Sequence, residues 1–278
     1  MKKHFLWIKS PFPSINFWGM ITLILAAVAC TPVTAASDSE GFPTQTEASP
    51  RVTAILILQH GVSPDASYAG TSDVVITNLW ETNTQLGGWE GLDTYRDDQE
   101  RHRILIRFDL SPLPPGVQIQ SATLSLSRFD SEFDGAPQTV SAYRLTAPWT
   151  EGSGTGTNPA PGYIPDGATY TLAAPGTPWA NPGGDFDASP TATTVVPAFT
   201  APGWIDWDLT GLVSQWASGA LPNNGLILRT RDGDYTGHRF YSRDDAAHPT
   251  LRPRLTIVYT LDGASPTHDL AHPVACQD

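Results

Sequence analysis

Several aromatic side chains fall in segments rich in glycine, proline and polar residues, where a ring can face solvent. The flat face of such a ring stacks on the C–H groups of a sugar, and polar side chains beside it bond to the sugar hydroxyls. The candidates for this chemistry are Trp80, Trp89, Tyr95, Trp179 and Tyr235. For each of them the alternative role is to pin a loop onto the protein. The pattern predicts sugar binding as the first chemistry to test.

Arginine is the second residue type with suitable chemistry, because all three lysines lie within the first nine residues. A guanidinium group donates two parallel hydrogen bonds to a carboxylate, which suits it to an acidic sugar. Arg103, Arg231 and Arg243 are the candidates for such contacts. They predict that the bound polysaccharide carries acidic groups.

Aspartates recur in the same loops and offer the oxygen ligands that calcium prefers. The candidate metal ligands are Asp65, Asp73, Asp185 and Asp187, and a further cluster contains Asp232, Asp234, Asp244 and Asp245. The sequence has no twelve-residue calcium-binding loop. We expect at most one structural calcium ion and no other cofactor.

No catalytic signature is found in the sequence, whether a Gly-x-Ser-x-Gly turn, a His-Glu-x-x-His helix or a phosphate-binding loop. Two carboxylates for glycoside hydrolysis can come from distant strands, so sequence spacing does not decide that case. We assign no catalytic residue, and a secreted polysaccharide-degrading enzyme is the third-ranked hypothesis.

The N-terminus has the features of an export signal. Lysines precede an apolar run of about 13 residues, which is shorter than the roughly 20 that a membrane-spanning helix needs. The run ends at Ala27-Val28-Ala29-Cys30, which is similar to a bacterial lipobox, while cleavage after Ala35 is the alternative. We expect a signal peptide over residues 1–30, lipidation of Cys30 and a disordered tether over residues 31–50. The protein then lies on the outer face of the cell envelope or is secreted, and contacts the membrane only through its lipid anchor.

Beyond this signal the chain is strongly acidic. Thirteen arginines stand against 28 aspartates and glutamates, which gives a formal charge of −15. Duplex nucleic acid and anionic lipid gain no counterion release from such a surface. Nucleic acid is therefore excluded as a partner.

Apolar and polar residues alternate with a period of two in many short segments bounded by glycine and proline, which indicates antiparallel strands. Nine strands are predicted at residues 54–59, 74–77, 103–108, 122–127, 140–145, 204–208, 225–229, 239–241 and 255–259. One short helix follows Asp208, with Thr210 or Asp208 as its cap and Leu212, Val213 and Trp216 toward the core. We predict an all-β chain whose single domain, at residues 51–260, is an antiparallel, jelly-roll-like β-sandwich with long loops. A polar tail follows at 261–278.

A set of local signatures occurs in a fixed order along this domain, and the set resembles the DNRLRE domain family of secreted prokaryotic β-sandwiches. The signatures are residues 68–73 (YAGTSD), 106–111 (IRFDLS), 113–116 (LPPG), 121–126 (SATLSL), 149–152 (WTEG), 167–170 (GATY), 178–179 (PW) with 182–186 (PGGDF), 208–210 (DLT), 224–228 (NGLIL) and 252–255 (RPRL). The resemblance implies a non-catalytic surface module that binds extracellular polysaccharide, because a related module binds alginate. A structural or adhesion domain that binds protein or acts as a spacer is the second hypothesis.

The lipobox-like sequence predicts the location of the protein. Replacing the acylated thiol in Cys30→Ser removes the only anchor that the sequence offers, so the variant should move from the membrane fraction to the medium. Cell fractionation with an immunoblot measures this. A wild-type protein that is already soluble and begins near Ala36 or Ser37 would show that there is no lipid anchor.

Overall fold

The computed structural model describes residues 51–79, 84–132, 136–156, 164–231 and 233–262. They belong to one compact unit. The predicted signal peptide, Cys30, the tether, Trp80, Asp232 and the tail from residue 263 onward lie outside the described residues.

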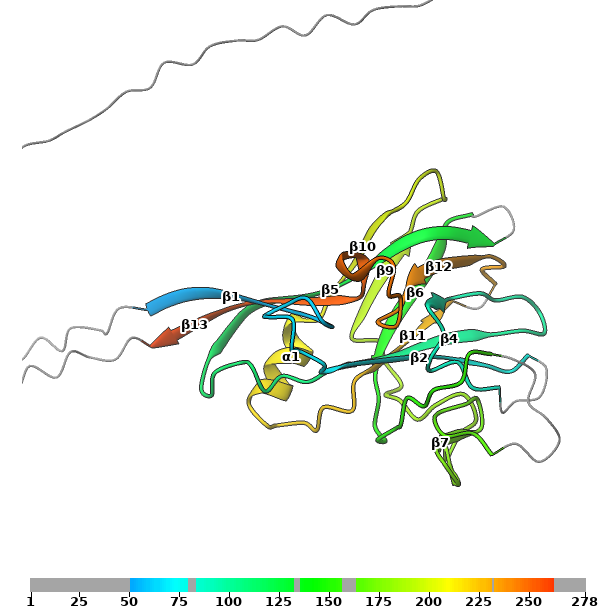
Figure 1. Cartoon of the computed structure of the whole chain (residues 1–278), viewed down its shortest axis with the longest axis horizontal. Helices are drawn as coiled ribbons and strands as arrows, with labels where there is room; N and C mark the ends of the chain where they lie inside the picture. Colours follow the sequence, from blue (N-terminus) through cyan, green and yellow to red (C-terminus); the bar gives the residue numbers. More distant parts are fainter. Residues whose placement is uncertain (1–50, 80–83, 133–135, 157–163, 232, 263–278) are drawn as a thin grey trace, which may run out of the picture. The chain divides into compact units, whose positions relative to one another are not determined.

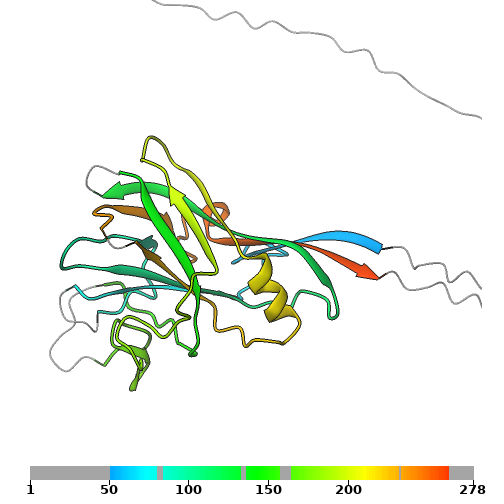
Figure 2. The same cartoon turned by 180° about the vertical axis from the view of Figure 1, so that it is seen from behind.

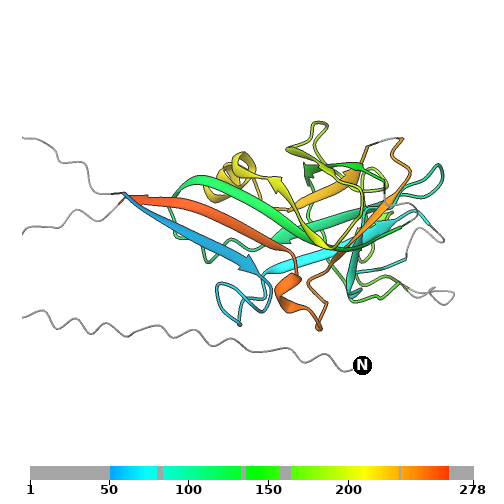
Figure 3. The same cartoon turned by 90° about the horizontal axis from the view of Figure 1, so that it is seen from above.

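The first sheet has six strands, which pair in the order β1, β13, β5, β12 and β3, while β10 also pairs with β5. All of these pairings are antiparallel. The strands are β1 (Arg51–Gln59), β3 (Gly91–Asp93), β5 (Gln118–Glu132), β10 (Gly203–Asp208), β12 (Gly237–Tyr241) and β13 (Arg254–Asp262). Seen from above, β1, β13 and β5 run side by side (Figure 3).

The second sheet has five strands in the order β2, β4, β11, β6 and β9, again antiparallel. These strands are β2 (Thr71–Thr77), β4 (His102–Phe108), β6 (Gln138–Arg144), β9 (Ala192–Val196) and β11 (Leu226–Thr230). A small two-stranded sheet joins β7 (Leu172–Ala174) to β8 (Thr177–Pro178). Figure 1 shows the two large sheets as separate layers, with β1, β13 and β5 in one and β2, β4 and β11 in the other.

The two layers bury their facing sides in one hydrophobic core. Leu124 and Leu126 of β5 are fully buried in it and meet Ile104 and Ile106 of β4, also in this core. Because side chains alternate across a strand, Ser121 and Thr123 of β5 point to the opposite face of the sheet. The predicted all-β antiparallel sandwich is confirmed.

Each of the nine predicted strand segments lies in an observed strand, apart from one-residue differences at the ends. The four additional strands, β3, β7, β8 and β9, have only two to five residues. Segments this short do not produce a periodic pattern that stands out from a loop. They are held by pairing with neighbours that are distant in the sequence.

The five-stranded sheet is buried on its outer face too. Val74 and Ile76 of β2 and Leu105 of β4 point away from the main core and form a second hydrophobic cluster. The segment after β6 covers them with Trp149 and Trp179, which are both 4% exposed. In its described part, the segment between β6 and β9, one of the expected long loops, therefore supplies a third layer over this sheet.

The predicted short helix is α1 (Thr210–Ala217), and Leu212, Val213 and Trp216 are its buried residues as predicted. It lies against β5 (Figure 2). The predicted cap is wrong, because the N-cap residue is Leu209 and makes no side-chain capping bond. Asp208 Oδ1 instead accepts the Thr210 N–H at 2.9 Å. Among the described residues, no helix has the length and apolar character needed to span a membrane.

Trp216 gives a direct test of the main core. Its side chain is 8% exposed and contacts the buried cluster between the sheets. Trp216→Ala should lower the free energy of unfolding by roughly 3–5 kcal/mol, as large aromatic truncations in packed interiors do. Chemical denaturation measures the change. A loss no larger than that of the exposed Val195→Ala would place Trp216 outside the core.

Candidate functional site

A pocket of about 430 Å³ opens between β2 and β3, the edge strands of the two large sheets. We call it the mouth pocket. Its lining combines apolar and charged side chains from both layers and from the segments beside them: Val75, Thr77, Leu79, Leu86, Trp89, Asp93, Tyr95, Glu100, His102, Thr155, Gly156 and Arg239. Two of the predicted sugar-stacking residues, Trp89 and Tyr95, meet here.

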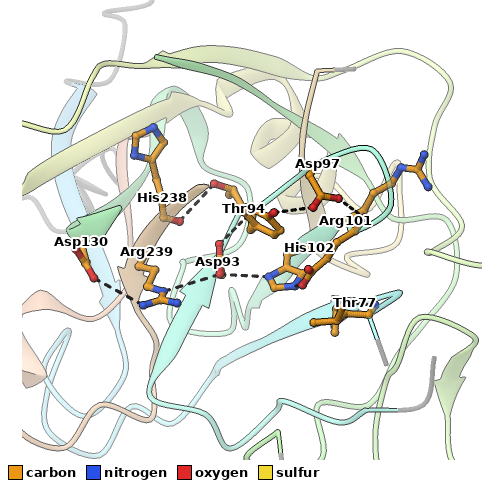
Figure 4. Close-up of polar contacts among 12 residues, drawn as sticks. Thr77, Asp93, Thr94, Asp97, Arg101, His102, Asp130, His238 and Arg239 are labelled. Atoms are coloured by element: carbon orange, nitrogen blue, oxygen red, sulfur yellow. Dashed lines mark hydrogen bonds and ion pairs between the residues drawn. The ribbon is translucent and has the colours of Figure 1, made fainter. Parts of the chain in front are cut away.

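Opposite charges alternate along one wall of the mouth pocket (Figure 4). His102 places Nδ1 3.2 Å from Asp93 Oδ2 and Nε2 2.5 Å from Glu100 Oε1. Arg239 Nε lies 3.9 Å from the same Asp93 oxygen. The wall therefore alternates Glu100, His102, Asp93 and Arg239. None of these four residues was predicted from the sequence as a site residue, because only the pairing of β3, β4 and β12 with their neighbours brings them together.

Residues 93–102 form a hairpin that holds Asp93, Glu100 and His102 in place. Its strands are linked by the His102 N–H, which donates to Tyr95 O at 2.8 Å. Asp97 Oδ1 closes the turn by accepting the N–H groups of Gln99 and Glu100. The Tyr95 N–H donates to Asp93 Oδ1 at 2.7 Å. These bonds fix Asp93 and His102 before any ligand arrives, as a preorganised site requires.

The two carboxylates also control the charge of His102. Burial lowers the pKa of His102, but the hydrogen bond and charge of Asp93 together with the charge of Glu100 outweigh burial and raise the pKa above 6.5. When His102 is protonated, it and Arg239 stand against Asp93, Glu100 and also Asp130, whose Oδ2 lies 3.7 Å from Arg239 Nη1. The polar wall then has no net positive charge, while it offers both donors and acceptors.

A second site lies on the outer face of the five-stranded sheet. It is a shallow groove of about 390 Å³, which we call the arginine groove, lined by Thr139, Ser141, Tyr143, Thr193, Arg229, Thr230 and Arg231. Strand register places Arg229 beside Ser141, and Ser141 beside Thr193. The Arg231 side chain is 67% exposed and is held by Asp234 at 3.0 Å. The groove presents guanidinium groups, hydroxyls and one aromatic ring to solvent.

Arg103 extends the positive charge of this face toward β4. Its guanidinium lies 5.8 Å from the Phe186 ring, and that of Arg229 lies 5.7 Å from the same ring. Cation–π contacts with this ring help to hold both groups in place. Burial lowers the pKa of Arg103, the charge of Tyr170 opposes this, and the neighbouring arginines lower the pKa further. This is local positive charge on an acidic chain.

A third cluster joins Asp73 of β2, Glu151 and Asp244, whose ligand atoms lie within 4.8 Å of one another. Arg243 sits among them: its Nε donates to Glu151 Oε1 at 2.6 Å and its backbone N–H donates to Asp73 Oδ2 at 2.8 Å. These oxygens could ligate a cation, but Arg243 already supplies positive charge between them. We call this the buried carboxylate cluster.

Burial disfavours ionisation of this cluster. It raises the pKa of Glu151 to about 7, against the opposing effect of Arg243 and of the Asp73 N–H. Burial, then the charge of Glu151, raises the pKa of Asp73 well above its usual value. Glu151 was not among the predicted residues. The cluster links β2, the covering segment and the segment after β12, and it lines none of the pockets described above.

The remaining predicted ligand residues are dispersed. The expectation for Trp179 is corrected, because its ring is buried and its Nε1 donates to Thr169 O at 2.9 Å. Tyr235 is 57% exposed and its hydroxyl donates to Asp98, next to the mouth-pocket hairpin. Arg243 is taken up by the buried carboxylate cluster, so it is not an exposed ligand contact.

The four predicted metal ligands do not come together either. Asp65 accepts hydrogen bonds from its neighbour Ser67, and Asp185 accepts them from Ala180 and Asn181. Asp187 makes a two-bond ion pair with Arg144. Only Asp73 joins a carboxylate cluster, and its neighbours there are not the predicted ones. The four residues are therefore not gathered in one cluster, and calcium binding stays a prediction.

A comparison of the chain with models of known protein families finds no match. A search of curated proteins finds no match either.

The buried carboxylate cluster predicts how stability depends on pH. The pKa of Glu151 is raised in the folded protein, so the stabilisation from its protonated form is present below the unfolded value of 4.5 and is lost as pH rises to about 7. Glu151→Gln stays neutral, so the stability of the variant relative to wild type should rise by about 2 kcal/mol between pH 4.5 and 8. Denaturation across this range measures the difference. The exposed Glu90→Gln is the control, and parallel curves for Glu151→Gln and wild type would contradict the account.

Proposed function

We propose that the protein is a non-catalytic, cell-surface or secreted module that binds extracellular polysaccharide and holds its acidic units in the arginine groove. The resemblance to the DNRLRE domain family supports this proposal, as does the sandwich fold. The observation that carries it is the arginine groove itself, where Arg229, Arg231 and Tyr143 share one surface with three threonines and a serine.

The composition of the groove suits a polyuronate. Guanidinium groups pair with carboxylates, while the ring of Tyr143 and the hydroxyl side chains suit the rest of a sugar. The surrounding chain carries a formal charge of −15 and repels a polyanion over longer distances. Binding is then local and weak, with a Kd in the micromolar to millimolar range, because few contacts contribute.

The lipid anchor and the arginine groove together indicate where the protein acts. Lipidation of Cys30 would hold the sandwich on the outer face of the envelope, at the end of the 31–50 tether. Polysaccharide outside the cell is then within reach, and no membrane-spanning element is needed.

One observation favours a structural or adhesion role as the second candidate function. The edge strand β1 exposes Ile55 and Ile57, which are 67% and 36% exposed, and the end of β1 exposes Val52. An exposed apolar edge strand is a surface on which another protein can pair. In this alternative the arginine groove would have no carbohydrate ligand.

Substitution of Arg231 distinguishes the polysaccharide-binding function from the adhesion role. Its side chain is exposed and buries little surface, so Arg231→Ala should keep the wild-type Tm and lose at least about half of the retardation in an alginate affinity gel. Arg231→Lys keeps the charge but not the two-bond geometry, so its retardation in the gel should lie between those of wild type and Arg231→Ala.

Controls make this result specific. Arg51→Ala removes one charge from exposed β1, far from the groove in the strand order, and should migrate like wild type. Loss of retardation after chelation alone would mean that a divalent cation bridges the ligand. If alginate, pectin and neutral glucans all leave wild-type mobility unchanged, with and without calcium, the carbohydrate function is wrong and the adhesion role replaces it.

A further inference from the structure

We propose that the mouth pocket is a second, separate carbohydrate site that receives one neutral pyranose unit at the end of a chain. The inference rests on the proposed carbohydrate function, but on residues that the arginine groove does not share. It assigns the two sites different ligands: acidic units on the open sheet face and a neutral terminal unit between the sheets.

The position of the pocket supports the choice of a chain end. Its volume of about 430 Å³ lies within the range of small-molecule sites. It is lined by Val75 of β2, which is fully buried and belongs to the main core. Both sheets and the core behind them bound the pocket. A single unit seated against this wall leaves the rest of its chain on the solvent side.

The lining has an apolar side and a polar side. Leu79, Leu86 and Trp89 provide apolar surface, and Leu86 and Trp89 also pack on the main core. Asp93, His102 and Arg239 provide the polar wall, with Asp93 only 3% exposed. A pyranose has the matching two-sided character, since its C–H groups stack on apolar or aromatic surface while its hydroxyls bond to charged groups. Trp89 is the ring for stacking.

Charge distinguishes this pocket from the arginine groove. Asp93 and Glu100 face the pocket from β3 and the hairpin, and Arg239 faces it from β12. His102 and Arg239 are matched by Asp93 and Glu100, and Arg239 also pairs with Asp130, so no net positive charge is left for a uronate. A ligand carboxylate would meet Asp93 and Glu100 at close range, where like charges repel. The site therefore favours hydroxyls, which donate to Asp93 and accept from Arg239.

The buried position of the charged groups also argues for a ligand function. Charged side chains this close to a core cost free energy unless each is paired, and an apolar wall would be less costly. Here they are paired, and the Asp93 carboxylate is also fixed by the Tyr95 N–H, while all of them line an accessible pocket. This arrangement is what a preorganised polar site requires.

The test is isothermal titration of the full mature protein with methyl glycosides of glucose, galactose and mannose. Methyl glucuronide is titrated, beside the same glycosides, into the Arg231→Ala variant, because the arginine groove of the wild-type protein would bind the glucuronide. At least one neutral glycoside should bind with a millimolar Kd, and the glucuronide should bind at least about tenfold more weakly. Asp93→Asn keeps an acceptor for the Tyr95 N–H but removes the charge, and should weaken binding of the neutral glycoside at least tenfold. Thr155→Trp fills the exposed rim of the pocket and should abolish binding without touching the charged wall.

Arg231→Ala is the matched control, because it alters the groove and should leave glycoside binding unchanged. Binding of a neutral glycoside that survives Thr155→Trp, or that is lost in Arg231→Ala, would overturn the assignment. So would binding of the glucuronide but of no neutral glycoside to Arg231→Ala, or binding of no glycoside at all. Because alginate retention reports on the groove and methyl glycosides report on the pocket, failure of either site is distinguishable from failure of the other.

Discussion

The burial of both faces of the five-stranded sheet is the constraint on which the rest of the molecule depends. Val75 faces the main core while its neighbours Val74 and Ile76 face the second cluster. A sheet buried on one side only would leave these side chains in water, at a cost of about 1.5–3 kcal/mol each. The segment between β6 and β9 must therefore fold back over the sheet. The positions of Glu151, Thr155 and Phe186 all follow from that requirement.

Both candidate sites lie where this covering ends. At the edge beside β2 and β3 the two layers are not closed by apolar side chains, and charged groups line the opening instead. Toward β6 and β9 the second cluster gives way to Tyr143 and Phe186, which contact it from partly buried positions. Beyond them the guanidinium of Arg229 lies over Tyr143 and Phe186, and that of Arg103 lies over Phe186. The packing that stabilises the sheet thus also positions the groups proposed to bind ligand.

The strands were predictable because their signal is local. In β5, the alternation places Ala122, Leu124 and Leu126 on the face that packs in the main core. The opposite face is not open to water throughout, because Ser125 and Ser127 are only 4% and 3% exposed. The short helix was predictable for the same reason, since its three buried residues follow helical spacing. Strand β3, which was not predicted, has three residues and is defined only by its pairing with β12.

The sites were less predictable because their signal is not local. Arg243 bonds to residues 92 and 170 positions away, so its sequence neighbours did not reveal that it is internally paired. Asp93, Glu100 and Arg239 had no motif to mark them. Trp179 shows a further limit: an aromatic residue in a polar segment has the same sequence signal whether it covers a core or faces a ligand. Trp89 and Tyr95 had that signal too, and they line the pocket.

The claim that the arginine groove is the polysaccharide surface is tested most directly by nuclear magnetic resonance. Unsaturated or saturated oligouronates would be titrated into the isotope-labelled protein while the backbone amide shifts are followed. The account predicts that the shifts concentrate at Ser141, Thr193, Arg229 and Arg231, on the three strands that form the groove. Shifts confined to β1, or no shifts at millimolar ligand, would contradict it.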